Sequence, residues 1–131
     1  MDREKALEFA WEWIFAVNSH DVEKILTLYS DDVVLDSPVI VGRFGIEEGM
    51  LQGKQHLRHY WEMAMEVRPY IYFRLIDVFV GVRTVIVYYE NLGRTMVCET
   101  FDFDHDGKVI CSSSLPGEPL SDVPCLYYVN R

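Results

Sequence analysis

The sequence lacks the features that mark several large classes of protein. Its three cysteines, Cys98, Cys111 and Cys125, are an odd number without the spacing of a disulfide framework or a zinc site. No apolar run approaches the roughly 20 residues that a membrane span needs. Residues 2–5 are all charged, and no apolar secretory signal follows them. We therefore expect reduced thiols, no membrane partner and a cytoplasmic protein.

Basic residues are also scarce. The chain has 12 Lys and Arg against 21 Asp and Glu, which gives a formal net charge of −9. A nucleic-acid partner needs a basic face, so this class of function is excluded. The sequence also has no phosphate loop, dinucleotide-binding fingerprint or nucleophile elbow.

What the chain does have is enough apolar material for one packed domain. It has 131 residues, of which 50% are hydrophobic and 14% aromatic, so a sizeable core can form. The aromatic rings either fill that core or line a cavity, and composition alone does not separate the two. We expect one domain over residues 1–131, with its core at about 3–115 and an irregular, proline-containing tail at 116–131.

The first half of the chain is mainly helical in pattern. Apolar residues recur at helical spacing in residues 3–18, 21–29 and 54–66. Asp2 stands where it can cap the first of these helices. A short strand at 33–35 ends at Asp36, just before Ser37-Pro38. Residues 39–52 contain three glycines and no strong period, so we expect a loop there.

The second half is typical of β-structure. Strands are predicted at 71–80, 83–90, 94–103 and 108–115, with turns at 91–93 and 105–107. Helices followed by a long antiparallel meander predict an α+β fold. A meander of this length must curl around the helices. The expected architecture is a curved antiparallel or mixed sheet wrapped on three N-terminal helices, an open-ended cone with an internal pocket.

Strand register suggests what faces that pocket. If Glu90 pairs with Arg94, Glu99 lies opposite Val85 on the adjacent strand. The next turn, with Phe103 opposite Lys108, adds a third strand to the same face. The inward set, which we expect to line a pocket, is then Val87, Val97, Glu99, Phe101, Ile110 and Ser112.

Glu99 is the one acid in this apolar set. A desolvated carboxyl group without a cation has a raised pKa and stays protonated. Two alternatives remain open: the face is exposed to solvent, or an arginine pairs with Glu99.

Several stretches resemble a known family. They are residues 19–23, residues 28–38 (Leu-Tyr-Ser-Asp-Asp-Val-Val-Leu-Asp-Ser-Pro), Gly53-Lys54 at the start of a helix, and residues 103–109 in the last hairpin. Together they resemble the SnoaL-like and ketosteroid-isomerase-like branch of the nuclear transport factor 2-like superfamily, which has a cystatin-like α+β cone. The resemblance covers residues 5–115. It implies a homodimer formed through the outer face of the sheet.

The resemblance also implies two catalytic carboxyl groups and no cofactor. Asp36 falls on the position of a general base, and Glu99 on that of a neutral acid that donates a hydrogen bond to an oxyanion. For Asp36, the alternative is that it caps the Ser37-Pro38 turn. Trp13 and Trp61 stand where the isomerases carry tyrosines, which argues against steroid isomerase activity.

Two alternatives remain open for these tryptophans. Their indole rings line the pocket, or they pack in the core as ordinary apolar residues. Tyr29 matches a tyrosine of the family's hydrogen-bond network, so we count it with Trp13 and Trp61 among the pocket residues.

Two other kinds of site are disfavoured by the pattern. The acidic residues at 102–106 resemble half of a calcium loop but lack the closing glutamate, and His56 and His59 have no clear third ligand, so no metal site is predicted. An epoxide-hydrolase-like site needs arginine and aspartate two residues apart, whereas Arg74 and Asp77 are three apart.

The sequence thus favours an enzyme with cofactor-independent, isomerase- or cyclase-like acid/base chemistry on a small apolar or aromatic carbonyl compound. The alternative is a ligand-binding or dimerisation module of the same fold without catalysis.

Overall fold

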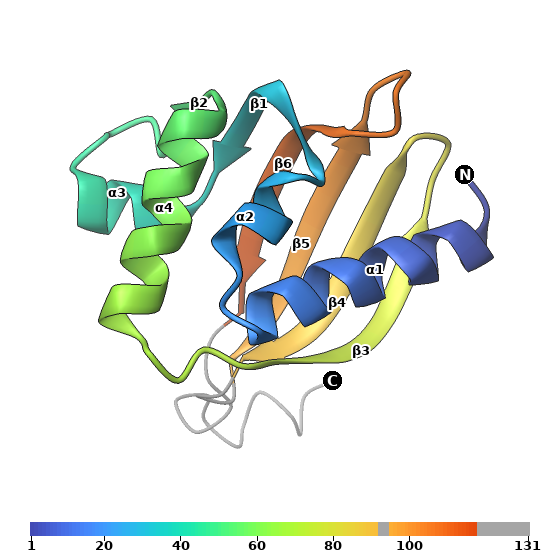
Figure 1. Ribbon diagram of the computed structural model, residues 1–131, viewed down its shortest axis with the longest axis horizontal. Coiled ribbons are helices and arrows are strands. Elements are labelled where there is room, and N and C mark those ends of the chain that lie inside the picture. The colour runs from blue at the N-terminus through green and yellow to red at the C-terminus, as the bar shows by residue number, and fades with distance from the viewer. Residues whose placement is uncertain (92–94, 118–131) are drawn as a thin grey trace, which may run out of the picture.

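The computed structural model describes residues 1–91 and 95–117 (Figure 1). Within these ranges the helices are α1 (Arg3–Asn18), α2 (Val22–Leu26), α3 (Pro38–Phe44) and α4 (Lys54–Val67). The strands are β1 (Tyr29–Asp36), β2 (Met50–Gln52), β3 (Phe73–Val80), β4 (Thr84–Asn91), β5 (Met96–Phe103) and β6 (Val109–Pro116). Residues 118–131 of the predicted tail at 116–131, and most of the predicted 91–93 turn, lie outside the described residues.

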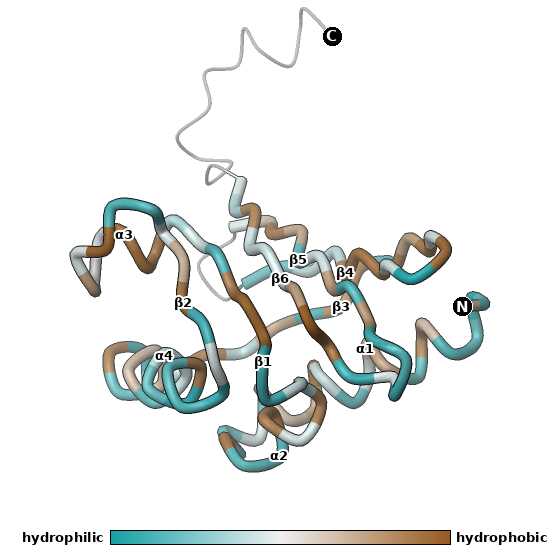
Figure 2. The backbone as a smooth tube through the Cα atoms, turned by 90° about the horizontal axis from the view of Figure 1, so that it is seen from above, coloured by the Kyte–Doolittle hydropathy of each residue, from teal (hydrophilic) through white to brown (hydrophobic). Residues whose placement is uncertain are grey.

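The strands form one mixed sheet in the order β2-β1-β6-β5-β4-β3. The β1–β6 pair is parallel and the other four pairs are antiparallel. Because β2 and β3 remain at opposite edges, the curved sheet does not close into a barrel. Helices α1, α2 and α4 lie along one side of the arch, and α3 lies near the β2 edge (Figure 2). The predicted α+β class and the mixed, curved sheet are confirmed.

Helix α1 has the predicted boundaries, because its N-cap and its apolar stripe both lie where the sequence pattern predicts them. The Asp2 carboxylate accepts a hydrogen bond of 2.9 Å from the Lys5 backbone N–H, which satisfies one of the free donors of the first turn. Ala6, Ala10, Trp13, Ile14 and Val17 are buried against the sheet. At its C-terminal end, the Asn18 side chain bonds both the backbone N–H and the C=O of Phe73. This contact fixes α1 to the start of β3.

The predicted loop at 39–52 is wrong. Residues 38–44 form α3, with Pro38 in the first turn, Ser37 as the N-cap and Gly45 in the left-handed conformation at the C-cap. The helix has only seven residues, too few to show a period. Strand β2 is only three residues long and exists through its pairing with β1.

The strand register differs from the predicted one by two residues. Glu99 lies opposite Val87 on β4 and Ser114 on β6, rather than opposite Val85 and Ser112. A shift of two preserves which face each side chain occupies, so Glu99 still points inward and is 5% exposed. A β-bulge between Asp102 and Phe103 breaks the pattern on β6.

The core is dominated by aromatic rings around Trp13, which is fully buried. Its ring centroid lies 5.1 Å from that of Phe101, 5.4 Å from Tyr89 and 6.1 Å from Trp61. Its indole N–H donates a 3.0 Å hydrogen bond to the Tyr29 hydroxyl. This cluster joins α1 and α4 to the inner face of the sheet.

Candidate active-site cavity

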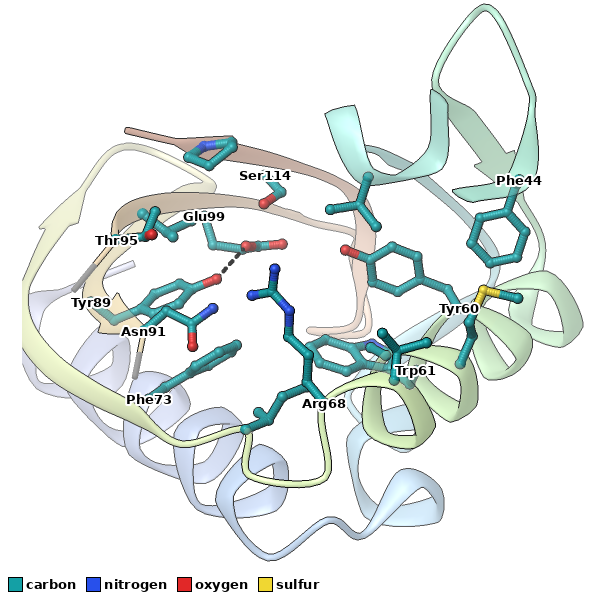
Figure 3. A pocket seen from close by; sticks show the side chains of 17 residues that line it. Phe44, Tyr60, Trp61, Arg68, Phe73, Tyr89, Asn91, Thr95, Glu99 and Ser114 are labelled. Carbon is teal, nitrogen blue, oxygen red and sulfur yellow. Dashed lines mark hydrogen bonds between the residues drawn. The ribbon is translucent and has the colours of Figure 1, made fainter. Parts of the chain in front are cut away.

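A cavity of about 230 Å³ opens between the second half of α4 and the ends of β3, β4, β5 and β6 (Figure 3). Helix α3 closes one side with Val39 and Phe44. The walls are mostly apolar and aromatic. The polar groups on them are few: Tyr60, Arg68, Tyr89, Asn91, Thr95, Glu99 and Ser114. A mostly apolar cavity with a few polar groups is the usual form of a small-molecule site.

Glu99 is the buried acid of this cavity. Its Oε1 accepts a 3.0 Å hydrogen bond from the Tyr89 hydroxyl, and Ser114 supplies a second hydrogen bond. Burial raises the pKa of Glu99 from 4.5 to about 8, although both hydrogen bonds lower it and the charge of Asp36 adds a small rise. The carboxyl group is therefore protonated near neutral pH and holds a proton that it can donate.

Tyr60 reaches into the cavity from α4, and its hydroxyl is directed toward Glu99 (Figure 3). Burial and the nearby Glu99 raise the pKa of Tyr60 to about 12, while a hydrogen bond with the Ser37 hydroxyl lowers it. Its ring stacks on that of Phe44, with the centroids 6.3 Å apart. The phenol is thus held in place, remains neutral, and stands opposite the acid as a hydrogen-bond donor.

Arg68 lies at the mouth. It is the C-cap residue of α4, and its guanidinium group points into the cavity toward Glu99 (Figure 3). No hydrogen bond or ion pair joins this side chain to another residue of the described chain. The predicted alternative, an arginine paired with Glu99, is therefore not realised as an ion pair.

Asp36 does not share the cavity. Along β1 the buried residues are Val33 and Leu35, and Ser37 just beyond the strand end is also buried. Since successive side chains alternate between faces, Asp36 points to the outer face. There its Oδ2 accepts a 2.9 Å hydrogen bond from the Ser113 hydroxyl. Asp36 and Glu99 are not brought together, and Ser37 occupies the inward position at the end of β1.

Comparison with protein families identifies this arrangement. A family model described as the SnoaL-like domain matches residues 11–111. The chain belongs to the SnoaL-like family. No curated protein shows significant sequence similarity to it.

Solved structures agree with this membership. A SnoaL-like protein of unknown function from Burkholderia thailandensis is 32% identical, with a TM-score of 0.86 over 89% of this chain and 98% of that chain. A nuclear transport factor 2-like protein of unknown function from Burkholderia xenovorans is 18% identical, with a TM-score of 0.71 over 97% and 94% of the two chains. A putative SnoaL-like polyketide cyclase from Shewanella denitrificans is 16% identical, with a TM-score of 0.70 over 92% and 96%. The two more distant proteins share the fold.

The predicted site residues of this SnoaL-like domain divide into three groups. Those that line the cavity are Trp61, Val97 and Glu99. Those buried in the core without lining it are Trp13, Tyr29, Val87, Phe101 and Ser112. Those outside both are Asp36 and Ile110.

Ile110 was predicted to face the pocket, and this is wrong. It falls at the β-bulge, where the strand pairing changes from Phe103–Val109 to Asp102–Cys111. Val109 is fully buried instead, and Ile110 is half-buried on another surface. The bulge inserts one residue into β6, so Ile110 loses the inward position that simple alternation gives it.

Sequence reasoning missed the other polar groups of the cavity. Tyr89 was detectable, since it lies two residues from Val87 and therefore on the same face. Tyr60 lies next to Trp61 within the predicted helix at 54–66, where helical spacing alone indicates core packing as readily as a place in the cavity. Nothing in the sequence indicated that Arg68 lines the cavity, because the charge of an arginine at a helix end does not reveal which way its side chain turns.

Other features of the SnoaL-like domain lie apart from the cavity. Arg74 pairs with Glu90, and Asp77 pairs with Arg3, so neither side chain forms an epoxide-hydrolase-like set. Cys98 and Cys111 are free thiols, and Cys125 lies outside the described residues. Within the described ranges, no helix is long and apolar enough to cross a membrane, and no group of three His, Cys, Asp or Glu side chains could hold a metal ion.

Proposed function

We propose that this SnoaL-like domain binds a small, largely apolar carbonyl compound and that Glu99 transfers a proton on it without a cofactor, in an isomerase- or cyclase-like reaction. The observation that carries the proposal is a carboxyl group that is buried in an aromatic cavity and accepts a hydrogen bond from Tyr89. A pKa of about 8 is close to the value at which one group acts well both as acid and as base near neutral pH.

The chemistry requires two events at neighbouring atoms of the ligand. Glu99 gives its proton to the carbonyl oxygen, while the Tyr60 hydroxyl donates a hydrogen bond to the same oxygen. The Glu99 carboxylate then removes a proton from the adjacent carbon. The C–H electron pair forms a carbon–carbon double bond, the C=O bond becomes C–OH, and Glu99 regains its proton. The product is the enol.

The enol can react further in two ways. Returning the proton to a different carbon of a conjugated system moves a double bond, which is an isomerisation. Attack of the enol carbon on a second carbonyl group of the same molecule closes a ring. The Shewanella denitrificans protein is described as a putative polyketide cyclase. This description supports including ring closure beside isomerisation in the proposed chemistry.

The size of the cavity limits the ligand. Its volume of about 230 Å³ is below the roughly 300–1,000 Å³ of pockets for drug-sized molecules. One or two fused rings are therefore expected, rather than the four rings of a steroid. The indole of Trp61 and the ring of Phe73 supply flat apolar walls for such a ligand.

Deuterium exchange tests the proposal directly. With 1-indanone in D₂O, the wild-type protein should speed the incorporation of deuterium next to the carbonyl, as followed by NMR. Glu99→Gln keeps the side-chain shape but removes the transferable proton, so exchange should fall to the uncatalysed rate while 1-indanone binding remains. Asp36→Asn is the matched control and should exchange like the wild type. Catalysed exchange that survives Glu99→Gln would refute the proposal.

A second candidate is a ligand-binding module without turnover. It is supported by the fact that the cavity, as far as the chain is described, contains only one carboxyl group. The same experiment separates the two functions. If 1-indanone binds to the wild type but its exchange is not accelerated, the domain binds ligands without catalysis.

A further inference from the structure

When Glu99 is protonated, the side chains that line the cavity carry a net positive charge. Of the side chains that line it, Arg68 and Glu99 are the two that carry charge at accessible pH, because Tyr60 and Tyr89 both have raised pKa values. Glu99 is neutral below a pH of about 8, whereas a guanidinium group is always charged. The cavity therefore presents one cation and no anion near neutral pH.

The position of Arg68 makes this cation available to a ligand. The residue lies where α4 ends, so its backbone is fixed by the hydrogen bond of 3.0 Å from the Arg68 N–H to the Ala64 carbonyl. Its side chain is exposed and turns across the mouth instead of away into solvent (Figure 3). The other arginines with resolved pairing, Arg3, Arg58 and Arg74, each bind a carboxylate of this chain.

The two ends of the cavity therefore differ in what they recognise. The inner end has the neutral donors Glu99 and Tyr60, which suit a carbonyl oxygen. The outer end has a planar cation with paired N–H groups, which suits a carboxylate in bidentate geometry. Apolar side chains such as Val67 and Ile71 lie beside Arg68 on the wall, and they weaken the competition from water for an ion pair formed there.

We propose that the substrate is a small keto acid, a ring compound whose carbonyl group meets Glu99 and whose carboxylate pairs with Arg68 at the mouth. This inference rests on the proposed function and specifies its substrate class. A carboxylate fits better than a phosphate ester, because Arg68 is the only cation among the lining residues of the described cavity, and a dianion would remain partly unpaired.

A matched pair of ligands tests the inference. The probes are 3-oxoindane-1-carboxylate and its carboxamide, which have the same ring and ketone but differ in charge. By titration calorimetry near pH 7, the wild type should bind the carboxylate roughly three- to tenfold more tightly than the carboxamide. This preference should decrease as salt is added, because the ion pair forms at an exposed mouth.

Variants assign the preference to one residue. Arg68→Gln should abolish this preference, because it weakens binding of the carboxylate far more than binding of the carboxamide, whereas Arg68→Lys should retain part of it. Arg74→Gln removes another exposed arginine, which lies outside the cavity, and should keep the full preference. Because Arg68 packs on the surface, its substitution leaves the core untouched, and carboxamide binding verifies that the cavity is intact.

The outcomes distinguish this inference from the proposed function. Equal binding of both probes to the wild type, or a preference that survives Arg68→Gln, overturns the keto-acid inference, while catalysed exchange of 1-indanone would still stand. Failure of 1-indanone, the carboxylate and the carboxamide to bind at all overturns both.

Discussion

The hydroxyl of Tyr89 donates a 3.0 Å hydrogen bond to the carboxyl group of Glu99, and both side chains are buried. The two residues lie on adjacent strands and face the same cavity. The bond from Tyr89 fixes Oε1 of the carboxyl group, and Ser114 supplies a second hydrogen bond. Burial keeps the group protonated, and the hydrogen bond limits how far its pKa rises.

The stability of the protein should fall with rising pH because of Glu99. The unfolded chain releases this proton near pH 4.5, whereas the folded protein keeps it to about pH 8. Between these values the folded state holds one more proton, so its free energy of unfolding decreases by up to about 1.4 kcal/mol per pH unit. Glu99→Gln removes this contribution and should flatten the profile, as measured by urea unfolding from pH 4.5 to 8.

Glu62→Gln provides the control for that profile, because Glu62 is an exposed carboxylate on α4. Its pH dependence should match that of the wild type. A Glu99→Gln profile as steep as the wild-type profile would show that Glu99 is ionised in the folded protein.

Removing the Tyr89 hydroxyl should shift the titration of Glu99 upward. The hydrogen bond favours the charged carboxylate, so Tyr89→Phe raises the pKa of Glu99 above its value of about 8. NMR of ¹³C-labelled glutamate carboxyl groups measures the midpoint directly. Tyr88→Phe removes a hydroxyl from the opposite face of the same strand and should leave the midpoint unchanged. A lower midpoint in Tyr89→Phe would contradict the assigned role of the bond.

Trp13 should behave as core and Trp11 as surface, although they lie two residues apart on α1. Trp13 is 0% exposed and Trp11 is 57% exposed. Trp13→Ala should lower the free energy of unfolding by about 3–5 kcal/mol, and Trp11→Ala should change it by less than about 0.5 kcal/mol. Chemical denaturation measures both. Similar losses in the two variants would be incompatible with the packing described above.

We also expect the domain to form a homodimer through the outer face of its sheet. Phe79 on β3 and Leu115 on β6 are large apolar side chains that are about half exposed on that face. Phe79→Lys should shift sedimentation toward the monomer, because a charge placed in an apolar interface is costly. Val82→Lys, in the turn after β3, should not. A wild-type protein that sediments as a monomer at high concentration would refute the dimer.

Local signals were sufficient to predict α1, α4 and strands β3 to β6, whereas α3 was missed and only residues 33–35 of β1 were predicted as strand. The cap at Asp2 and the apolar stripe behind it defined α1. The Ser37-Pro38 and Gly45 capping signals of α3 were present as well, but seven residues give no readable period. Strand β2 has no signal of its own, since only its pairing with β1 makes it a strand.

The candidate site was partly predictable for the same reason. Face alternation placed Glu99 inward even though its cross-strand partner was two residues away from the expected one, since an even shift preserves the face. The same rule, applied to the buried Val33 and Leu35, places the Asp36 side chain on the outer face. The family resemblance, which put Asp36 at the position of a general base, was misleading here. The bulge that displaces Ile110 depends on pairing between distant segments and was not predictable from its neighbours.

The inward position of Ser37 has a consequence for engineering. This residue is buried, caps α3 and contacts Tyr60, so it stands beside the cavity on the strand end where Asp36 faces away. Aspartate caps helices as well as serine does. A single substitution, Ser37→Asp, would therefore place a second carboxyl group next to Tyr60, where burial would raise its pKa as it does for Glu99. The scaffold is thus one substitution away from a site with two buried carboxyl groups.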